Sequence, residues 1–143
     1  MKKIRLFIVP ALFLTLFSCT TDEDHPAGIS DASLSSMSGD DLVLVRTVDA
    51  GGSVWNIKMN ESAARAYASN LAFPPNSMIV KEKLNADGAP SGYDIMYNAP
   101  ADGNSHDGWL WTGLDEQRQL VFSSAERALS CQGCHSGLSK TIH

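Results

Sequence analysis

Hydrophobic and polar residues alternate over several short stretches of this chain, and a two-residue period is typical of strands with one buried face. Glycine, proline, asparagine and aspartate separate these stretches and predict turns between them. We expect five strands, at residues 42–48, 53–58, 77–84, 93–97 and 109–112. The pattern therefore predicts a mainly β (α+β) fold built on an antiparallel sheet with a few short helices.

Two segments have helical rather than strand character. An alanine-rich segment, residues 61–69, follows Asn60, which is a favourable N-cap residue. A second helix is expected to begin at Ser123, where Ser123-Ser124-Ala125-Glu126 has the capping-box pattern. This second helix would run into Cys131 and Cys134, so the cysteine pair is expected on the C-terminal helix.

The first residues of the chain have the order of an export signal. Three basic residues precede an apolar run at residues 6–17, and the small Ser18 precedes Cys19. The apolar run is too short and wrongly flanked for a permanent membrane helix. The sequence therefore predicts export from the cytoplasm.

Leu16-Phe17-Ser18-Cys19 resembles the bacterial lipoprotein signal, in which the cysteine thiol receives a diacylglycerol group. On this resemblance, residues 1–18 are a lipoprotein signal peptide and Cys19 is the lipidated residue, which anchors the protein at the cell envelope, facing the periplasm or the cell surface. Ordinary secretory cleavage near the same place is the alternative. Residues 19–41 are polar and show no apolar period, which predicts a flexible tether before a domain at residues 42–143.

Composition and charge exclude some classes of structure and function. A chain of 143 residues has room for one ordinary domain, and 43% hydrophobic with 19% charged residues fits a folded domain rather than disorder. The formal net charge is −5, and no basic stripe of the kind that binds phosphates is present in the sequence. A nucleic-acid partner is therefore not expected.

Cys131-Gln132-Gly133-Cys134-His135 has the spacing of the c-type haem attachment motif. Residues three apart on a helical turn lie on one face, so both thiols can reach the two vinyl groups of one haem. His135 is then brought to the iron, which a neutral imidazole nitrogen can bind. We expect haem c, with Cys131 and Cys134 as its thioether attachments and His135 as the proximal ligand of the iron.

Three other kinds of site use cysteine pairs and compete with haem attachment at this motif. A disulfide would not require His135, and a zinc site needs four ligands whereas no second cysteine pair exists in the sequence. A thioredoxin-like pair would open a helix after a strand, whereas this pair is expected to close one. No methionine follows His135, so any sixth iron ligand is expected from upstream. Met59, Met78 and Met96 are candidate axial ligands, and core filling is the alternative for each of them.

Several motifs occur in an order that resembles the cytochrome P-460 family, which includes the β-sheet cytochromes c′. They are an Asn-plus-Ala helix start at residues 60–64, a Phe-Pro turn leading into residues 77–82, a strand ending at Met96, Gly-Trp-Leu-Trp at residues 108–111, and the cysteine motif. The resemblance spans residues 53–136. Residues 136–143 depart from the Asp-Tyr-Val-Phe continuation that is common in the family.

The resemblance implies a monohaem cytochrome that oxidises hydroxylamine or a related small nitrogen compound at an open distal site and passes electrons to a redox partner protein. Lys81 falls where the hydroxylamine-oxidising members place a lysine that bonds to the porphyrin. Pairing with a carboxylate or exposure to water is the alternative for Lys81, and Lys83 shares its strand face. The rival functions are binding of nitric oxide or carbon monoxide without turnover, and electron transfer with a filled sixth site. Contact with the membrane is expected through the lipid anchor only.

The remaining candidate residues are aromatic or acidic. Trp109 and Trp111 share one strand face, where core packing is favoured over a role as haem-pocket walls. Three carboxylates are candidate bases beside a distal site, and the sequence does not choose among them: Glu82, Asp94 and Asp107.

Overall fold

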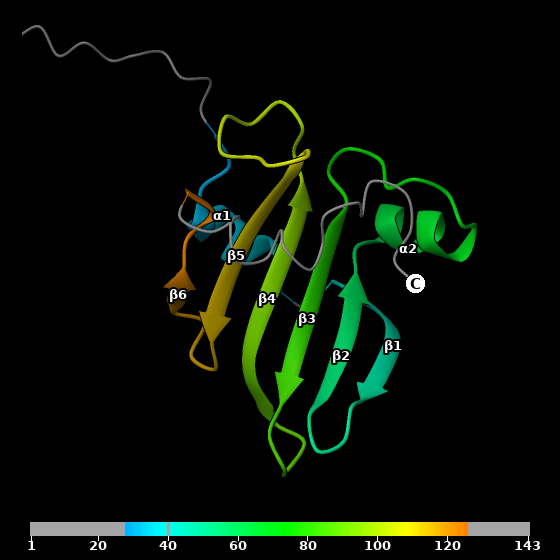
Figure 1. Ribbon diagram of the computed structural model, residues 1–143, viewed down its shortest axis with the longest axis vertical. Coiled ribbons are helices and arrows are strands. Elements are labelled where there is room, and N and C mark those ends of the chain that lie inside the picture. Colours follow the sequence, from blue (N-terminus) through cyan, green and yellow to red (C-terminus); the bar gives the residue numbers. More distant parts are fainter. Residues whose placement is uncertain (1–27, 40, 126–143) are drawn as a thin grey trace, which may run out of the picture.

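The computed structural model describes residues 28–39 and 41–125. Within these residues, six strands form one antiparallel sheet whose spatial order is the order of the sequence (Figure 1). The strands are β1 (Val43–Asp49), β2 (Val54–Met59), β3 (Met78–Leu84), β4 (Pro90–Asn98), β5 (Trp109–Asp115) and β6 (Leu120–Phe122). The helices are α1 (Asp31–Met37) and α2 (Glu61–Ala68). The prediction of a mainly β fold on an antiparallel sheet is confirmed.

The connection between β2 and β3 carries α2, and one asparagine ties this helix to the sheet. The side-chain oxygen of Asn60 accepts from the backbone N–H of Ala63 at 3.2 Å, which caps the first turn of α2. The same oxygen accepts from the N–H of Met78 at 3.1 Å, at the start of β3. Asn60 is therefore both the predicted N-cap and a link between α2 and a central strand.

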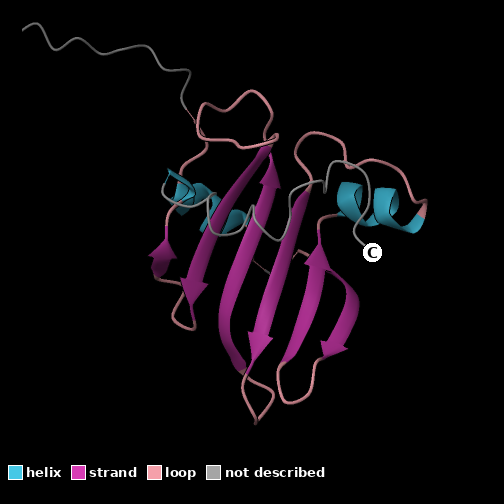
Figure 2. Ribbon diagram, viewed as in Figure 1, coloured by secondary structure: helices cyan, strands magenta, loops and turns pink. Residues whose placement is uncertain are grey.

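The sheet has two apolar faces because side chains alternate along each strand. The α1 face packs against Leu34 of α1, and its buried members are Met78, Val80, Tyr93, Ile95, Tyr97, Leu110 and Leu114. The opposite face is called the tryptophan face here, and its buried members are Met59, Ala63 of α2, Ile79, Met96, Trp109 and Trp111. In Figure 2 the two helices lie at opposite sides of the sheet, α1 beside β5 and β6 and α2 beside β1 and β2.

The structure corrects the prediction that residues 19–41 are a flexible tether throughout. Leu34 of α1 is fully buried in the core of the α1 face. The guanidinium of Arg118 donates to the carbonyl oxygen of Ser38 at 2.7 Å, and Asp31 accepts from the N–H of Ser124 at 2.9 Å. The domain therefore includes α1, because a leucine in the core and hydrogen bonds to distant residues hold this segment on the sheet.

Only the start of the predicted C-terminal helix lies within the described residues. Residues 124 and 125 are helical, and the hydroxyl of Ser123 accepts from the N–H of Ala125 at 3.1 Å. This agrees with the helix start that the sequence predicts at Ser123. In the part of the chain that the structure describes, no helix is both long enough and apolar enough to cross a membrane.

Candidate functional site

Trp109 and Trp111 are both core residues of the tryptophan face. Their exposed fractions are 5% and 8%, and Phe73, from the loop after α2, meets Trp109 edge to face with ring centroids 5.9 Å apart. Edge-to-face pairs of this kind stabilise a core beyond the area that they bury. The tryptophans therefore pack in the core, as the sequence analysis favoured, and at the same time they make this face aromatic.

Phe122 of β6 also packs on the tryptophan face, and its ring lies over Gly113 of β5, which has no side chain. Gly113 of β5 lies opposite Asp94, and a Cβ atom at residue 113 would lie 2.2 Å from the ring of Phe122. Only a glycine therefore lets the Phe122 ring come this close to β5. The ring extends the aromatic surface toward β6.

Lys81 lies on the tryptophan face of an interior strand. It lies two residues after the buried Ile79 on β3, so the two side chains share a face, and β3 is paired on both sides, with β2 and with β4. Its ammonium nitrogen lies 4.2 Å from the ring centroid of Trp55, a cation–π contact. Among the described residues Lys81 makes no ion pair. Lys81 is therefore neither paired with a carboxylate of these residues nor located on an edge strand.

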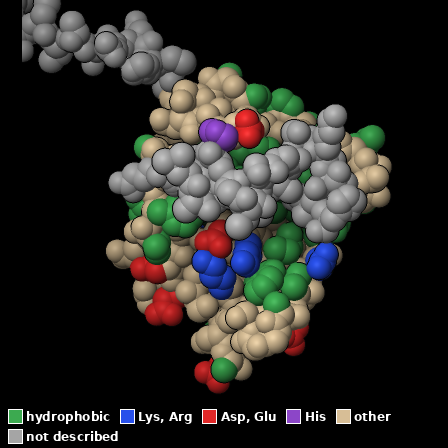
Figure 3. Space-filling view, in the orientation of Figure 1, with side chains coloured by type: hydrophobic (Ala, Val, Ile, Leu, Met, Phe, Trp, Pro, Cys, Tyr) green, Lys and Arg blue, Asp and Glu red, His purple; other side chains and the backbone are tan. Residues whose placement is uncertain are grey.

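Lys83, the second lysine of this face, is engaged elsewhere. Its Nζ atom donates to Oδ1 of Asp94 at 2.7 Å, and both side chains are partly exposed. Asp94, which is one of the three candidate bases, is therefore held in an ion pair. Figure 3 shows this face of the molecule, with basic and acidic side chains gathered beside a hydrophobic patch.

Glu82, a second candidate base, lies on the α1 face because it alternates with Lys81. Its two carboxylate oxygens accept from Lys58 at 2.7 Å and from Asn56 at 2.9 Å. Burial by itself would raise the pKa of Glu82, but the hydrogen bonds from Lys58 and Asn56, together with the positive charges of Lys58 and Arg118, outweigh burial, and the net pKa is lowered. Glu82 therefore remains ionised and paired, away from the tryptophan face.

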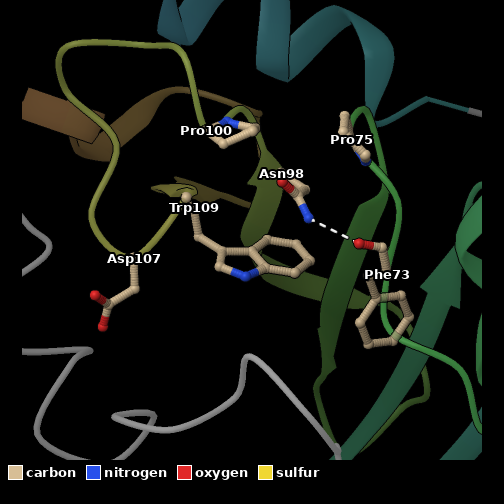
Figure 4. Close-up of a pocket in the computed structure, with 7 residues that line it drawn as sticks. Phe73, Pro75, Asn98, Pro100, Asp107 and Trp109 are labelled. Atoms are coloured by element: carbon tan, nitrogen blue, oxygen red, sulfur yellow. Dashed lines mark hydrogen bonds between the residues drawn. The ribbon is translucent and has the colours of Figure 1, made fainter.

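Asp107, the third candidate base, lies beside Trp109 at a surface pocket of about 290 Å³. Figure 4 shows Phe73, Asn98, Asp107 and Trp109 around it, with the Asn98 amide donating to the carbonyl oxygen of Phe73 at 3.1 Å. The Asp107 side chain is 70% exposed and lies 3.5 Å from Nδ1 of His106. Of the three carboxylates, Asp107 is thus the one at the aromatic surface without a lysine or arginine partner in the described residues.

The candidate methionines separate between the two faces. Met59 and Met96 belong to the tryptophan face, whereas Met78 is buried in the core of the α1 face. Met78 therefore cannot contribute to a site on the tryptophan face, because its side chain lies on the other side of the sheet. Within the described residues, no three histidine, cysteine, aspartate or glutamate side chains are grouped as metal ligands.

Two residues of this face were not singled out from the sequence. Trp55 contacts Lys81 from the diagonal position on β2, which only the strand register reveals. His106 pairs with Trp109 across a tight turn, and paired residues of antiparallel strands present their side chains on one face. Asp107 and Gly108 both have positive φ, as in a type I′ turn, and Asp-Gly is a common sequence signal for that turn. The turn could therefore have been predicted from the sequence, and with it the pairing of His106 and Trp109.

Comparison with protein-family models and with curated proteins found no match. The resemblance to the cytochrome P-460 family therefore stays a prediction from the motifs. Cys19, Cys131, Cys134 and His135 lie outside the described residues, as do the predicted signal peptide at residues 1–18 and most of the C-terminal helix.

Proposed function

We propose that this chain is an exported, lipid-anchored monohaem c-type cytochrome of the P-460 type that oxidises hydroxylamine or a related small nitrogen compound. Cys131 and Cys134 would hold the haem by thioether bonds, and His135 would bind its iron. The observation that carries the proposal beyond the sequence motif is the tryptophan face. It combines an aromatic surface with an amine, Lys81, that has no ion-pair partner among the described residues.

The described residues fit a haem in their chemistry. A porphyrin is a flat apolar group, and binding sites for such groups are lined mainly by aromatic and aliphatic side chains with a few polar ones. The tryptophan face offers Trp109, Trp111 and Met96, with Phe122 beside them. The network around Glu82 is turned to the other face of the sheet, so it adds no charge to this surface.

Oxidation of hydroxylamine to nitric oxide removes equal numbers of protons and electrons. The haem would supply the redox chemistry, and the electrons would pass to a redox partner protein. A carboxylate at the site would accept protons from the substrate. Asp107 is the best-placed acceptor because Asp94 is paired with Lys83 and Glu82 lies on the opposite face.

The proposed bond from Lys81 to the porphyrin would replace one N–H bond and one C–H bond by an N–C bond. It would release two protons and two electrons, which peroxide as the oxidant would accept to form two molecules of water. The amine has to be neutral when its nitrogen forms the bond. A bonded nitrogen would alter the electronic structure of the macrocycle, which is one of the ways that a protein tunes a cofactor.

Optical spectra of the holoprotein and hydroxylamine consumption with an added electron acceptor test the proposal. We expect a red-shifted Soret band in reduced wild type, and an ordinary c-type spectrum in Lys81→Ala and Lys81→Arg, with hydroxylamine oxidation lost together with the shift. Lys58→Ala is the matched control, because it removes a lysine from the opposite face. An ordinary wild-type spectrum without hydroxylamine consumption would contradict the enzymatic function.

The rival function is binding of nitric oxide or carbon monoxide without turnover. Two observations favour it: the buried members of the tryptophan face are apolar, and the carboxylate opposite Lys81 in the strand register, that of Asp94, is already paired. Apolar walls favour neutral diatomic gases over anions. A wild-type protein that binds nitric oxide, has the ordinary spectrum and leaves hydroxylamine unconsumed would establish this function instead.

A further inference from the structure

The two lysines of the tryptophan face exchange partners across the sheet. Asp94 of β4 stands directly opposite Lys81 in the strand register, and Trp55 of β2 stands directly opposite Lys83. Each lysine instead contacts the residue that stands opposite the other lysine. Lys83 binds Asp94 at 2.7 Å, and Lys81 lies over Trp55 with its nitrogen 4.2 Å from the ring centroid.

We propose that Lys83 is a positioning residue that binds the Asp94 carboxylate and so keeps the Lys81 amine free to react. The inference rests on the proposed function, in which Lys81 bonds to the porphyrin. Directly opposite residues of opposite charge attract one another across a sheet, so Asp94 is the natural partner of Lys81. The Lys83 ammonium neutralises that carboxylate and removes most of its attraction for Lys81.

The sheet is built to let Lys83 reach Asp94. The residue opposite Lys83 on β4 is Gly92, which has no side chain to obstruct the lysine stem. A Cβ atom at residue 92 would lie 3.9 Å from Cδ of Lys83, so the lysine stem passes over this position of β4. Lys83 thereby leans along β4 toward Asp94.

The partner of Lys81 matters for its chemistry. An ion pair with Asp94 would hold the Lys81 nitrogen in place and favour its charged form, whereas bond formation needs the neutral amine. A contact with the face of the partly buried Trp55 indole supplies no hydrogen-bond acceptor and is less directional. The Lys81 nitrogen can therefore leave its contact with Trp55 more readily than it could leave an ion pair with a carboxylate.

A rescue experiment with three variants of the holoprotein tests this positioning role. Lys83→Met keeps the apolar stem and removes the charge, which frees Asp94 to pair with Lys81. We expect the fraction of haem peptide cross-linked to Lys81, measured by mass spectrometry, to fall about two- to fivefold, as for an ion pair of this exposure. Asp94→Asn alone should leave that fraction unchanged, and the double variant Lys83→Met/Asp94→Asn should restore it to the wild-type level.

A second readout decides the same question without a cross-link. In protein that has not been cross-linked, lysine amines are methylated with ¹³C-formaldehyde and a borohydride reductant, and the ring current of Trp55 should move the methyl resonance of Lys81 upfield. We expect that shift in wild type and in the double variant, and its loss in Lys83→Met. Absence of a cross-link in wild type would count against the proposed function alone, because the resonance still reports where Lys81 lies.

Two results would overturn the positioning role. One is an unchanged cross-linked fraction and an unchanged Lys81 resonance in Lys83→Met. The other is a loss in Lys83→Met that the added Asp94→Asn change does not restore, because a purely structural defect would persist in the double variant.

Discussion

Replacing Leu34 by alanine tests whether α1 is part of the folded domain. Leu34 is fully buried and packs in the same core as Met78, Val80 and Leu110. Removal of a buried leucine side chain costs about 2–5 kcal/mol, because apolar contacts are lost and a cavity remains. For a domain of this size, such a loss corresponds to a decrease in Tm of roughly 10–30 °C.

Urea unfolding followed by tryptophan fluorescence, with thermal unfolding alongside, measures this loss. The matched control is Leu71→Ala, because Leu71 is 65% exposed and its truncation should change the free energy of unfolding by less than about 0.5 kcal/mol. The optical spectrum of folded Leu34→Ala should match that of wild type, since α1 lies on the face opposite the tryptophans. A Leu34→Ala variant as stable as the Leu71→Ala control would refute the packing of α1 in the core.

Two further predictions concern Glu82 and Cys19. The pKa of Glu82 is lowered in the folded state, so the stability linked to it is present above the unfolded value of about 4.5 and is lost as the pH falls through the folded pKa. The difference in unfolding free energy between wild type and Glu82→Gln should therefore shrink as the pH is lowered from about 7 to about 3; a constant difference would contradict the role of its charge. Cys19→Ala should move the protein from the membrane fraction to the soluble fraction, and a wild-type protein that is already wholly soluble after export would disprove the anchor.

The sequence predicted the strands well where hydrophobic and polar residues alternate clearly. It did not predict the elements that bury few side chains. The two-residue period placed Lys81 and Lys83 on one face of β3, and the structure agrees. Helix α1 was missed because Leu34 is its one buried residue, and a single apolar position has no period. Strand β6 was missed because it has three residues, too few to show alternation.

The arrangement of the candidate site depends on strand register, which residue patterns do not specify. The sequence gives no sign that Lys83 rather than Lys81 binds Asp94, because either lysine can reach a carboxylate on the neighbouring strand. Likewise, Trp55 becomes a neighbour of Lys81 only when β2 and β3 pair as they do. The residue types of the site were thus predictable, whereas their partners were not.

Covalent attachment of one haem is the central claim, and intact mass under denaturing conditions tests it most directly. The protein is matured in a strain competent for cytochrome c assembly, and denaturation removes any haem that is bound without a covalent bond. We predict that the wild-type mass exceeds that of the processed polypeptide by one haem, and that the double variant Cys131→Ala/Cys134→Ala lacks this addition. A wild-type protein that is colourless and has the mass of the polypeptide alone would contradict the account.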